Sequence, residues 1–149
     1  RMVKTLKYTG ATKSAPAIAS FMVTAWRDFG GVPGGVCIPI PLHPFRKKER
    51  GFNQAELLAR HCATSIGMSF SDDILIRIRQ TPPQTERSRH DRKSNILDAF
   101  SCMKPDAIKG VDVVLIDDVY TTCATLQEAA RVLKESGASE VRALTFAHG

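Results

Sequence analysis

The chain has 149 residues, of which 43% are hydrophobic and 24% are charged. This balance is typical of a soluble globular protein with a single core and excludes a disordered or fibrous chain. No apolar stretch reaches the ~18 residues that a membrane span needs. The formal net charge of +6 is concentrated in two clusters, which favours a polyanionic partner over a merely solvated basic face. The clusters are Arg46, Lys47, Lys48 and Arg50, and Arg77, Arg79, Arg87, Arg89, Arg92 and Lys93.

Neither the start of the chain nor its cysteines indicates export. No secretory signal pattern is present, so we expect a cytoplasmic protein. The four cysteines are scattered and form no CxxC pair, which argues against a zinc site in this chain and favours buried thiols. They are Cys37, Cys62, Cys102 and Cys123. Because the chain starts at Arg1 without an initiator methionine, we expect it to be a fragment that lacks its amino-terminal part.

The first third of the chain predicts a helix followed by a strand. The helix is expected over residues 14–29, with Ser14 as its cap and Pro16 in its first turn. Its apolar positions at helical spacing are Ile18, Phe21, Met22, Ala25 and Phe29, and Phe21 and Trp26 are interpreted as core residues. Glycines then break the chain before a short buried strand over residues 36–40, with Pro39 near its end.

The middle third predicts a basic loop, a helix, a strand and a long polar segment. Asn53 with Glu56 resembles a capping box, and Gly67 ends the helix that it opens. The buried positions of this helix are Ala55, Leu58, Ala59, Cys62 and Ile66. Residues 74–78 are typical of a strand. Residues 81–94 are polar and aperiodic, and a loop of that length in a compact domain is usually functional or mobile.

The last third has the clearest pattern. Residues 111–116 form a continuous apolar strand, as expected in a parallel sheet covered on both faces. A helix follows, ended by Gly137, and residues 141–146 form the next strand. The apolar positions of this helix are Leu126, Ala129, Ala130 and Leu133. The chain therefore predicts one α/β domain over residues 1–149 with a doubly wound, mainly parallel sheet.

Two adjacent carboxylates followed by a threonine-rich turn carry the most specific chemistry. Asp117 and Asp118 come at the carboxyl end of a buried strand, where open α/β sheets bind ligands. The following turn opens a helix, whose free N–H groups and dipole attract a phosphate. A lone Asp-Thr pair would be explained by helix capping alone, but this longer pattern favours a phosphorylated sugar with its hydroxyls on the carboxylates. A P-loop is excluded, because no Gly-Lys-Thr/Ser follows a glycine-rich turn. The turn comprises Thr121, Thr122, Cys123, Ala124 and Thr125.

This segment resembles the phosphoribosyl-pyrophosphate (PRPP) binding motif of type I phosphoribosyltransferases. Further signatures narrow the resemblance to the ComF-like family, which is linked to bacterial competence. They cover nearly the whole chain, and the run Arg50-Gly51-Phe52-Asn53-Gln54 is especially diagnostic. The others are Lys7-Tyr8 and residues 38–43, 77–84, 92–95 and 99–100.

The resemblance implies a role for each part of the site. Asp117 and Asp118, the catalytic pair, contact the 2′ and 3′ hydroxyls of ribose, and the 121–125 turn holds the 5′-phosphate. Residues 42–51 face the pyrophosphate, and residues 81–95 form a flexible hood. Mg²⁺ is held mainly by PRPP oxygens rather than by protein side chains. The basic residues assigned to the pyrophosphate and hood are Arg46, Lys47, Arg50 and Arg92.

The chain departs from the family pattern at several positions. Cys123 stands where the family usually has glycine, which costs about 1 kcal/mol if that backbone needs a positive φ. Asp98 also replaces a usual glycine, and Arg87 a usual leucine. The four-cysteine zinc ribbon that often precedes this domain in the family is absent from the sequence.

Three functions stay open. The first is a transferase that binds PRPP or a nucleoside 5′-monophosphate and acts on an unidentified acceptor. The second is an accessory protein of DNA uptake that binds single-stranded DNA, and the third is a sensor of phosphorylated ribose. The complete acid and threonine pattern favours the first. Only Phe45 and Phe52 flank a basic cluster, a thin stacking platform for DNA. His43 suits either a phosphate donor or a solvent-facing side chain, and the sequence does not indicate an oligomeric state.

Overall fold

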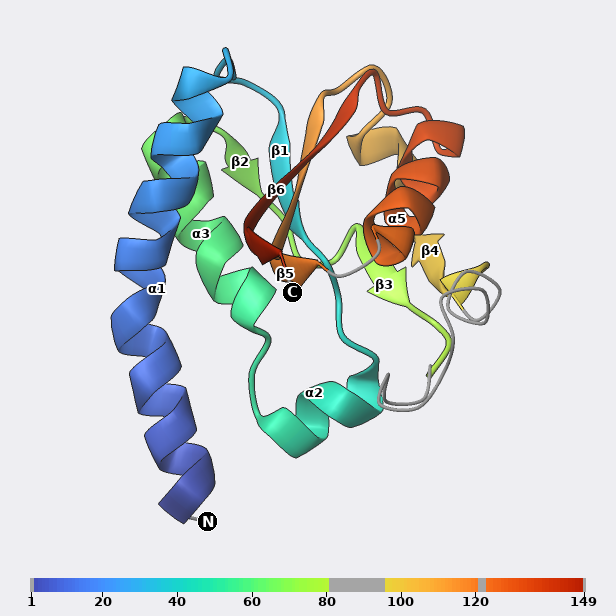
Figure 1. Cartoon of the computed structure of the whole chain (residues 1–149). Coiled ribbons are helices and arrows are strands. Elements are labelled where there is room, and N and C mark those ends of the chain that lie inside the picture. The colour runs from blue at the N-terminus through green and yellow to red at the C-terminus, as the bar shows by residue number, and fades with distance from the viewer. Residues whose placement is uncertain (1, 81–95, 121–122, 149) are drawn as a thin grey trace.

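A computed structural model describes residues 2–80, 96–120 and 123–148 (Figure 1). Four parallel strands form one sheet in the order β2-β1-β5-β6, and two further strands form an antiparallel pair. The parallel strands are β1 (Val36–Pro39), β2 (Ser69–Phe70), β5 (Val113–Tyr120) and β6 (Val141–His148). The antiparallel strands are β3 (Leu75–Arg77) and β4 (Phe100–Cys102).

The register of β5 places the two acids at the carboxyl end of the neighbouring strand β1. Strand β1 pairs with β5 from Val36↔Val113 to Pro39↔Ile116. Beyond that point β5 continues against β6 alone, as far as Tyr120↔His148. The strand expected before the acids is therefore confirmed as β5. It extends beyond the apolar residues, because its pairing with β6 continues past Asp117 and Asp118. Asp117 is the first β5 residue past the end of β1.

Helices cover both faces of the sheet, which confirms the doubly wound α/β arrangement (Figure 1). Helices α1 (Met2–Asp28) and α3 (Gln54–Ile66) lie on one face. Helix α5 (Ala124–Glu135) and the β3–β4 pair lie on the other. Residues Val113 to Ile116 are buried from both sides, as a continuous apolar run predicts. Among the described residues, no helix combines the length and hydropathy that crossing a membrane requires.

Helix α1 differs from its expected form in both start and face. It begins at Met2, and Ser14 is not its cap; the Ser14 hydroxyl donates to the carbonyl of Gly10 at 3.0 Å within the helix. Phe21 and Phe29 are 69% and 92% exposed, so the core assignment of Phe21 was wrong. The buried positions include the small Ala15 and Ala19, which allow α1 to pack closely on α3. The others are Met22, Val23 and Trp26.

The expected basic loop contains a helix, α2 (Pro44–Arg50). Pro44 occupies its first turn, where a missing N–H costs nothing, and His43 Nδ1 accepts a hydrogen bond from the backbone N–H of Phe45 at 3.3 Å. Gly51 ends it at φ 82°, a left-handed conformation that favours glycine. These local signals outweigh the unfavourable succession of positive charges.

Helix α3 is capped by Asn53, as expected. The Asn53 side chain accepts from Ala55 N–H at 3.2 Å and donates to the Ile40 carbonyl at 3.0 Å, which ties the helix start to the end of β1. The capping-box prediction was wrong for Glu56, whose carboxylate instead pairs with Lys47 and Arg60. The predicted buried stripe and the Gly67 end are confirmed.

Candidate functional site

The site is built where the main sheet ends, between β5 and the start of α5. Backbone N–H groups hold both carboxylates in place: Asp118 N–H donates to Asp117 Oδ1, and Val119 N–H donates to Asp118 Oδ1, each at 2.9 Å. Both side chains are half-buried. The structure therefore presents two neighbouring acids at the carboxyl ends of the strands, where the sequence pattern predicted them.

The two acids differ in their electrostatic surroundings. Burial, followed by the hydrogen bond and the charge of Asp118, raises the pKa of Asp117 to about 7. The positive charge of Arg77 acts in the opposite direction. A cation or a ligand that favours the charged form of Asp117 would let its carboxylate accept a hydrogen bond from a ligand hydroxyl.

Arg77 lies within electrostatic range of Asp117, and the sequence interpretation did not assign it to the site. It was counted in a basic cluster, but it lies on β3, 40 positions before Asp117. Its guanidinium lies 5.4 Å from the centre of the Phe100 ring. Burial and then the charge of Arg46 lower the pKa of Arg77, while Asp117 raises it. Arg77 therefore lies within electrostatic range both of Arg46 on α2 and of Asp117 in the second half of β5.

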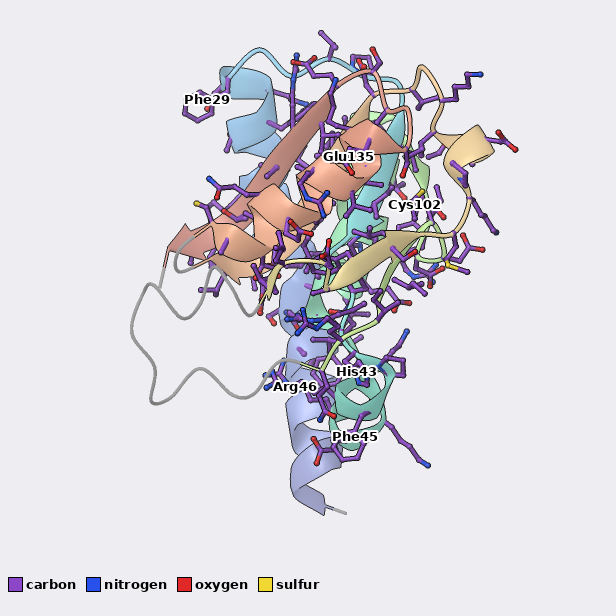
Figure 2. All side chains as sticks on the ribbon, turned by 90° about the vertical axis from the view of Figure 1, so that its right-hand side faces the viewer. Phe29, His43, Phe45, Arg46, Cys102 and Glu135 are labelled. Atoms are coloured by element: carbon purple, nitrogen blue, oxygen red, sulfur yellow. The ribbon has the colours of Figure 1, made fainter. Side chains whose placement is uncertain are left out.

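The basic residues of α2 differ in their surroundings. Arg46 is half-buried and close enough to Arg77 to influence its pKa. Lys47 pairs with Glu56 at 3.0 Å, and Arg50 is exposed. Figure 2 shows Phe45 and Arg46 on α2 and His43 at its N-cap. Because His43 Nδ1 accepts a backbone hydrogen bond, the ring hydrogen of a neutral His43 lies on Nε2. Arg92 lies outside the described residues.

A pocket of about 340 Å³ opens between β1, α2 and β3. Its walls are mostly apolar, and its charged lining residues are Lys47, Asp72 and Arg77. Within the described ranges, no three side chains among histidine, cysteine and the acids are grouped to hold a metal ion.

The turn into α5 is described from Cys123 onwards. Cys123 is the N-cap at φ 57°, and its carbonyl accepts from Gln127 N–H at 2.8 Å, which opens the helix. Ala124 and Thr125 form the first turn, next to N–H groups that have no partner within the helix. Thr121, Thr122 and the expected hood over 81–95 lie outside the described residues. The non-glycine residues with positive φ among those described are Cys123 and Asp98, the two positions at which the sequence resemblance implies a usual glycine.

Replacing Cys123 with glycine is expected to raise the free energy of unfolding by about 0.5–1 kcal/mol, because glycine adopts this φ without a Cβ clash. Urea unfolding measures the change. The control is Cys123→Ser, which removes the thiol but keeps the Cβ and should bring no such gain. Equal stability of the glycine and serine variants would contradict a strained backbone at this position.

Comparison with known proteins identifies the family. A sequence model of the phosphoribosyl transferase domain matches residues 51–149, well over half of the chain. The chain belongs to this family. It is 33% identical over 145 residues to the DNA utilization protein YhgH of Salmonella typhi, covering 95% of this chain and 63% of that protein. It is 40% identical over 112 residues to the competence protein ComFC of Bacillus subtilis, covering 74% and 43% respectively.

These relatives make the chain a ComF-like phosphoribosyltransferase-family member, as the sequence signatures predicted. The chain spans less than two thirds of the length of both relatives. The fold is also that of solved type I structures. Glutamine PRPP amidotransferase from B. subtilis superposes with a TM-score of 0.55 at 21% identity, over 87% of this chain and 25% of that one. At such low identity the likeness establishes the fold alone.

Proposed function

We propose that this chain binds PRPP or a nucleoside 5′-monophosphate and transfers the phosphoribosyl group to an acceptor. The observation that carries the proposal is the pair Asp117 and Asp118 in the second half of β5, just past the end of β1 and six and five residues before the N-cap of α5 at Cys123. The names of the relatives suggest a role in competence or DNA utilization, and we propose that the chain performs it in the cytoplasm. We treat residues 1–149 as one domain in this proposal.

Each end of the ligand has a matching part of the site. Asp117 and Asp118 accept hydrogen bonds from the 2′ and 3′ hydroxyls of ribose. The N–H groups at the start of α5, with the Thr125 hydroxyl, hold the 5′-phosphate. Thr121 and Thr122 complete this turn in the proposal, and Arg92 and the 81–95 segment cover the ligand. The pyrophosphate lies towards α2, where Arg46 is placed better than Lys47 or Arg50.

The chemistry needs positioning and charge rather than a covalent nucleophile. When the bond from C1′ to pyrophosphate breaks, its electron pair leaves with the pyrophosphate and positive charge develops on the ribose. An electron pair of the acceptor then forms the new bond to C1′. Carboxylates near the ribose and basic groups near the leaving group stabilise both charges.

The donor set fits Mg²⁺ delivered with PRPP. Asp117 and Asp118 offer the hard oxygen ligands that this ion prefers, yet two carboxylates do not form a complete protein cage. When bound, the ion neutralises the charge of the leaving pyrophosphate. Asp117 and Asp118 would contribute at most part of its coordination, and PRPP oxygens the remainder.

Calorimetry with PRPP and with AMP, each in the presence of Mg²⁺, tests the proposal. We expect both to bind, with Mg²⁺ tightening PRPP. Screening nucleobases, ammonia and other amines for PRPP consumption then identifies the acceptor. Binding without turnover in that screen would favour a sensor of phosphorylated ribose. Failure of the folded protein to bind either compound would refute the proposed site.

A second candidate function is binding of single-stranded DNA through α2. Phe45 is 54% exposed beside the exposed Lys48 and Arg50, so an aromatic face and basic side chains share one helix. If this surface binds DNA, affinity should fall steeply with salt as counterions are released. PRPP should compete with DNA, because Arg46 is assigned to the pyrophosphate of PRPP as well as to this surface. Changing the four basic residues of α2 to alanine should weaken DNA binding, and DNA that binds undiminished to this variant would contradict the surface. They are Arg46, Lys47, Lys48 and Arg50.

A further inference from the structure

The β3–β4 pair carries Arg77 on the same face of the sheet as α5 (Figure 1). Arg77 pairs in register with Phe100, over whose ring its guanidinium lies. Strand β4 packs against α5. The position of Arg77 therefore depends on how firmly this strand pair is held on that helix.

Glu128 forms the attachment on the α5 side. Its side chain is 5% exposed, yet it is charged, and the hydrogen bonds from Arg131 lower its pKa. Arg131 donates to both carboxylate oxygens, at 2.6 and 3.0 Å. The same carboxylate accepts the backbone N–H of Asp98 at 2.9 Å. Glu128, a buried acid, thus accepts one of its hydrogen bonds from the turn that leads into β4.

Asp98 is held from two directions. Besides its N–H bond to Glu128, its carboxylate accepts a hydrogen bond from Arg131 at 3.1 Å. These contacts keep Asp98 at φ 55°, a conformation that a residue with a Cβ rarely adopts. The network therefore stabilises a specific bend two residues before Phe100.

Further hydrogen bonds tie the end of β3 to the same turn. The N–H of Ile78 donates to the Ala99 carbonyl at 2.7 Å. The Arg79 side chain donates to the Leu97 carbonyl at 2.8 Å. A continuous set of hydrogen bonds consequently links the residues after β3 and the turn at Asp98 to helix α5. We name the β3–β4 part of this network, residues 75–79 and 97–102, the arm.

We propose that the arm presents Arg77 to an anionic group of the ligand beside Asp117, and that Glu128 is the residue that positions the arm. The geometry favours an anion there, because Arg77 and Lys47, two positively charged side chains, line the same pocket between β1, α2 and β3. The charge of Arg46 also acts on Arg77 and contributes to lowering its pKa. Resting on the proposed function, we assign the anion to the pyrophosphate of PRPP rather than to its 5′-phosphate, which belongs to α5.

Calorimetry with inorganic pyrophosphate and Mg²⁺, and separately with AMP, tests the role of Arg77. In the 149-residue chain, Arg77→Gln should lower pyrophosphate affinity by about tenfold or more, the scale of one charge-assisted contact. AMP affinity should fall much less, because AMP has no pyrophosphate and would lose only the effect of Arg77 on the charge of Asp117. The matched control is Arg142→Gln, which also removes an arginine beside an aromatic ring. Arg142 lies near the amino-terminal end of β6, away from the end of the sheet that holds the two acids. Unchanged pyrophosphate binding, or equal loss of both ligands, would overturn the assignment.

The positioning role of Glu128 has its own comparison. Glu128→Gln should weaken pyrophosphate binding by roughly fivefold while leaving AMP binding unchanged, because a displaced supporting residue misplaces the group it holds. Glu135→Gln is the matched control: it removes another partner of Arg131 on the exposed side of α5 (Figure 2) without touching Asp98. Adding Asp98→Gly to Glu128→Gln should restore affinity, because glycine adopts the positive φ unaided.

The outcomes separate this proposal from the proposed function. Wild-type protein that binds AMP but not pyrophosphate would refute the arm and leave the ribose site intact. Protein that binds pyrophosphate through Arg77 but neither AMP nor PRPP would refute the ribose site alone. If Glu128→Gln and Glu135→Gln have the same effect on pyrophosphate, or if glycine at position 98 fails to restore it, Glu128 does not position the arm.

Discussion

Replacing both Asp117 and Asp118 with asparagine is expected to abolish PRPP binding and to stabilise the fold at neutral and alkaline pH. The loss of binding follows because amides accept hydrogen bonds from ribose hydroxyls less strongly than carboxylates. The gain in stability follows because burial, together with the hydrogen bond and charge of Asp118, raises the pKa of Asp117 from 3.8 to about 7. Between these values the folded protein binds more protons than the unfolded chain, so the free energy of unfolding falls as pH rises.

The size and pH range of this effect can be measured by urea unfolding. At about pH 8 the free energy of unfolding of the double variant should exceed that of the wild type by at most about 4 kcal/mol. Each unit by which the pKa of Asp117 differs between the folded and unfolded states contributes about 1.4 kcal/mol. Near pH 3 the stabilisation should vanish, because Asp117 is then protonated in both states. Asp106→Asn, which removes an exposed acid, is the control. Undiminished PRPP affinity, or a stability difference independent of pH, would contradict the assigned role of the pair.

Gly35→Ala is expected to destabilise the protein by about 3 kcal/mol or more, the sum of a strained backbone and an overpacked contact. Gly35 has φ 86°, and an added Cβ would collide with the carbonyl oxygen of Asp112. That same carbonyl accepts the N–H of Val36 at 3.0 Å, while the Gly35 carbonyl accepts the N–H of Ser69 at 3.0 Å. The substitution therefore disturbs the first contacts of β1 with both neighbouring strands.

Gly34→Ala provides a matched control for this prediction. Gly34 has φ 104°, but an added Cβ would meet no atom within 4 Å. Only the backbone cost of about 1 kcal/mol should appear there. Both variants are compared by urea unfolding. Equal destabilisation at the two positions would show that the Asp112 contact does not govern the start of β1.

Much of the sheet and of the site was predictable because the signals are local. The apolar run before Asp117, the helix that follows and the next apolar strand predict a parallel βαβ unit, and β5, α5 and β6 form it. The side chain of Asn53 and the missing side chain of Gly67 act within a few residues of the α3 ends. The acids and the turn into α5 are adjacent in the chain, so their chemistry could be interpreted before their positions were known.

Features that depend on packing could not be predicted in the same way. Phe21 and Ala19 both lie at positions with suitable helical spacing, and the approach of α3 decides that the smaller residue is buried. The start of α1 was missed because Pro16 and Ser14 suit a first turn, yet they lie within a helix that begins at Met2.

The composition of the site beyond the acid motif was decided by tertiary structure alone. Arg46, Arg77 and Asp117 lie on three elements, and only the meeting of α2, β3 and β5 brings their charges together. In the sequence, Glu128 is an ordinary polar position on a helix. Its burial against Asp98 depends on where β4 packs. The sequence by itself determined the family, the parallel βαβ unit and the place of the two acids after the apolar run, because each depends on neighbouring residues. Which basic groups face those acids required the structure, because charges distant in sequence interact only through the distances that the fold creates.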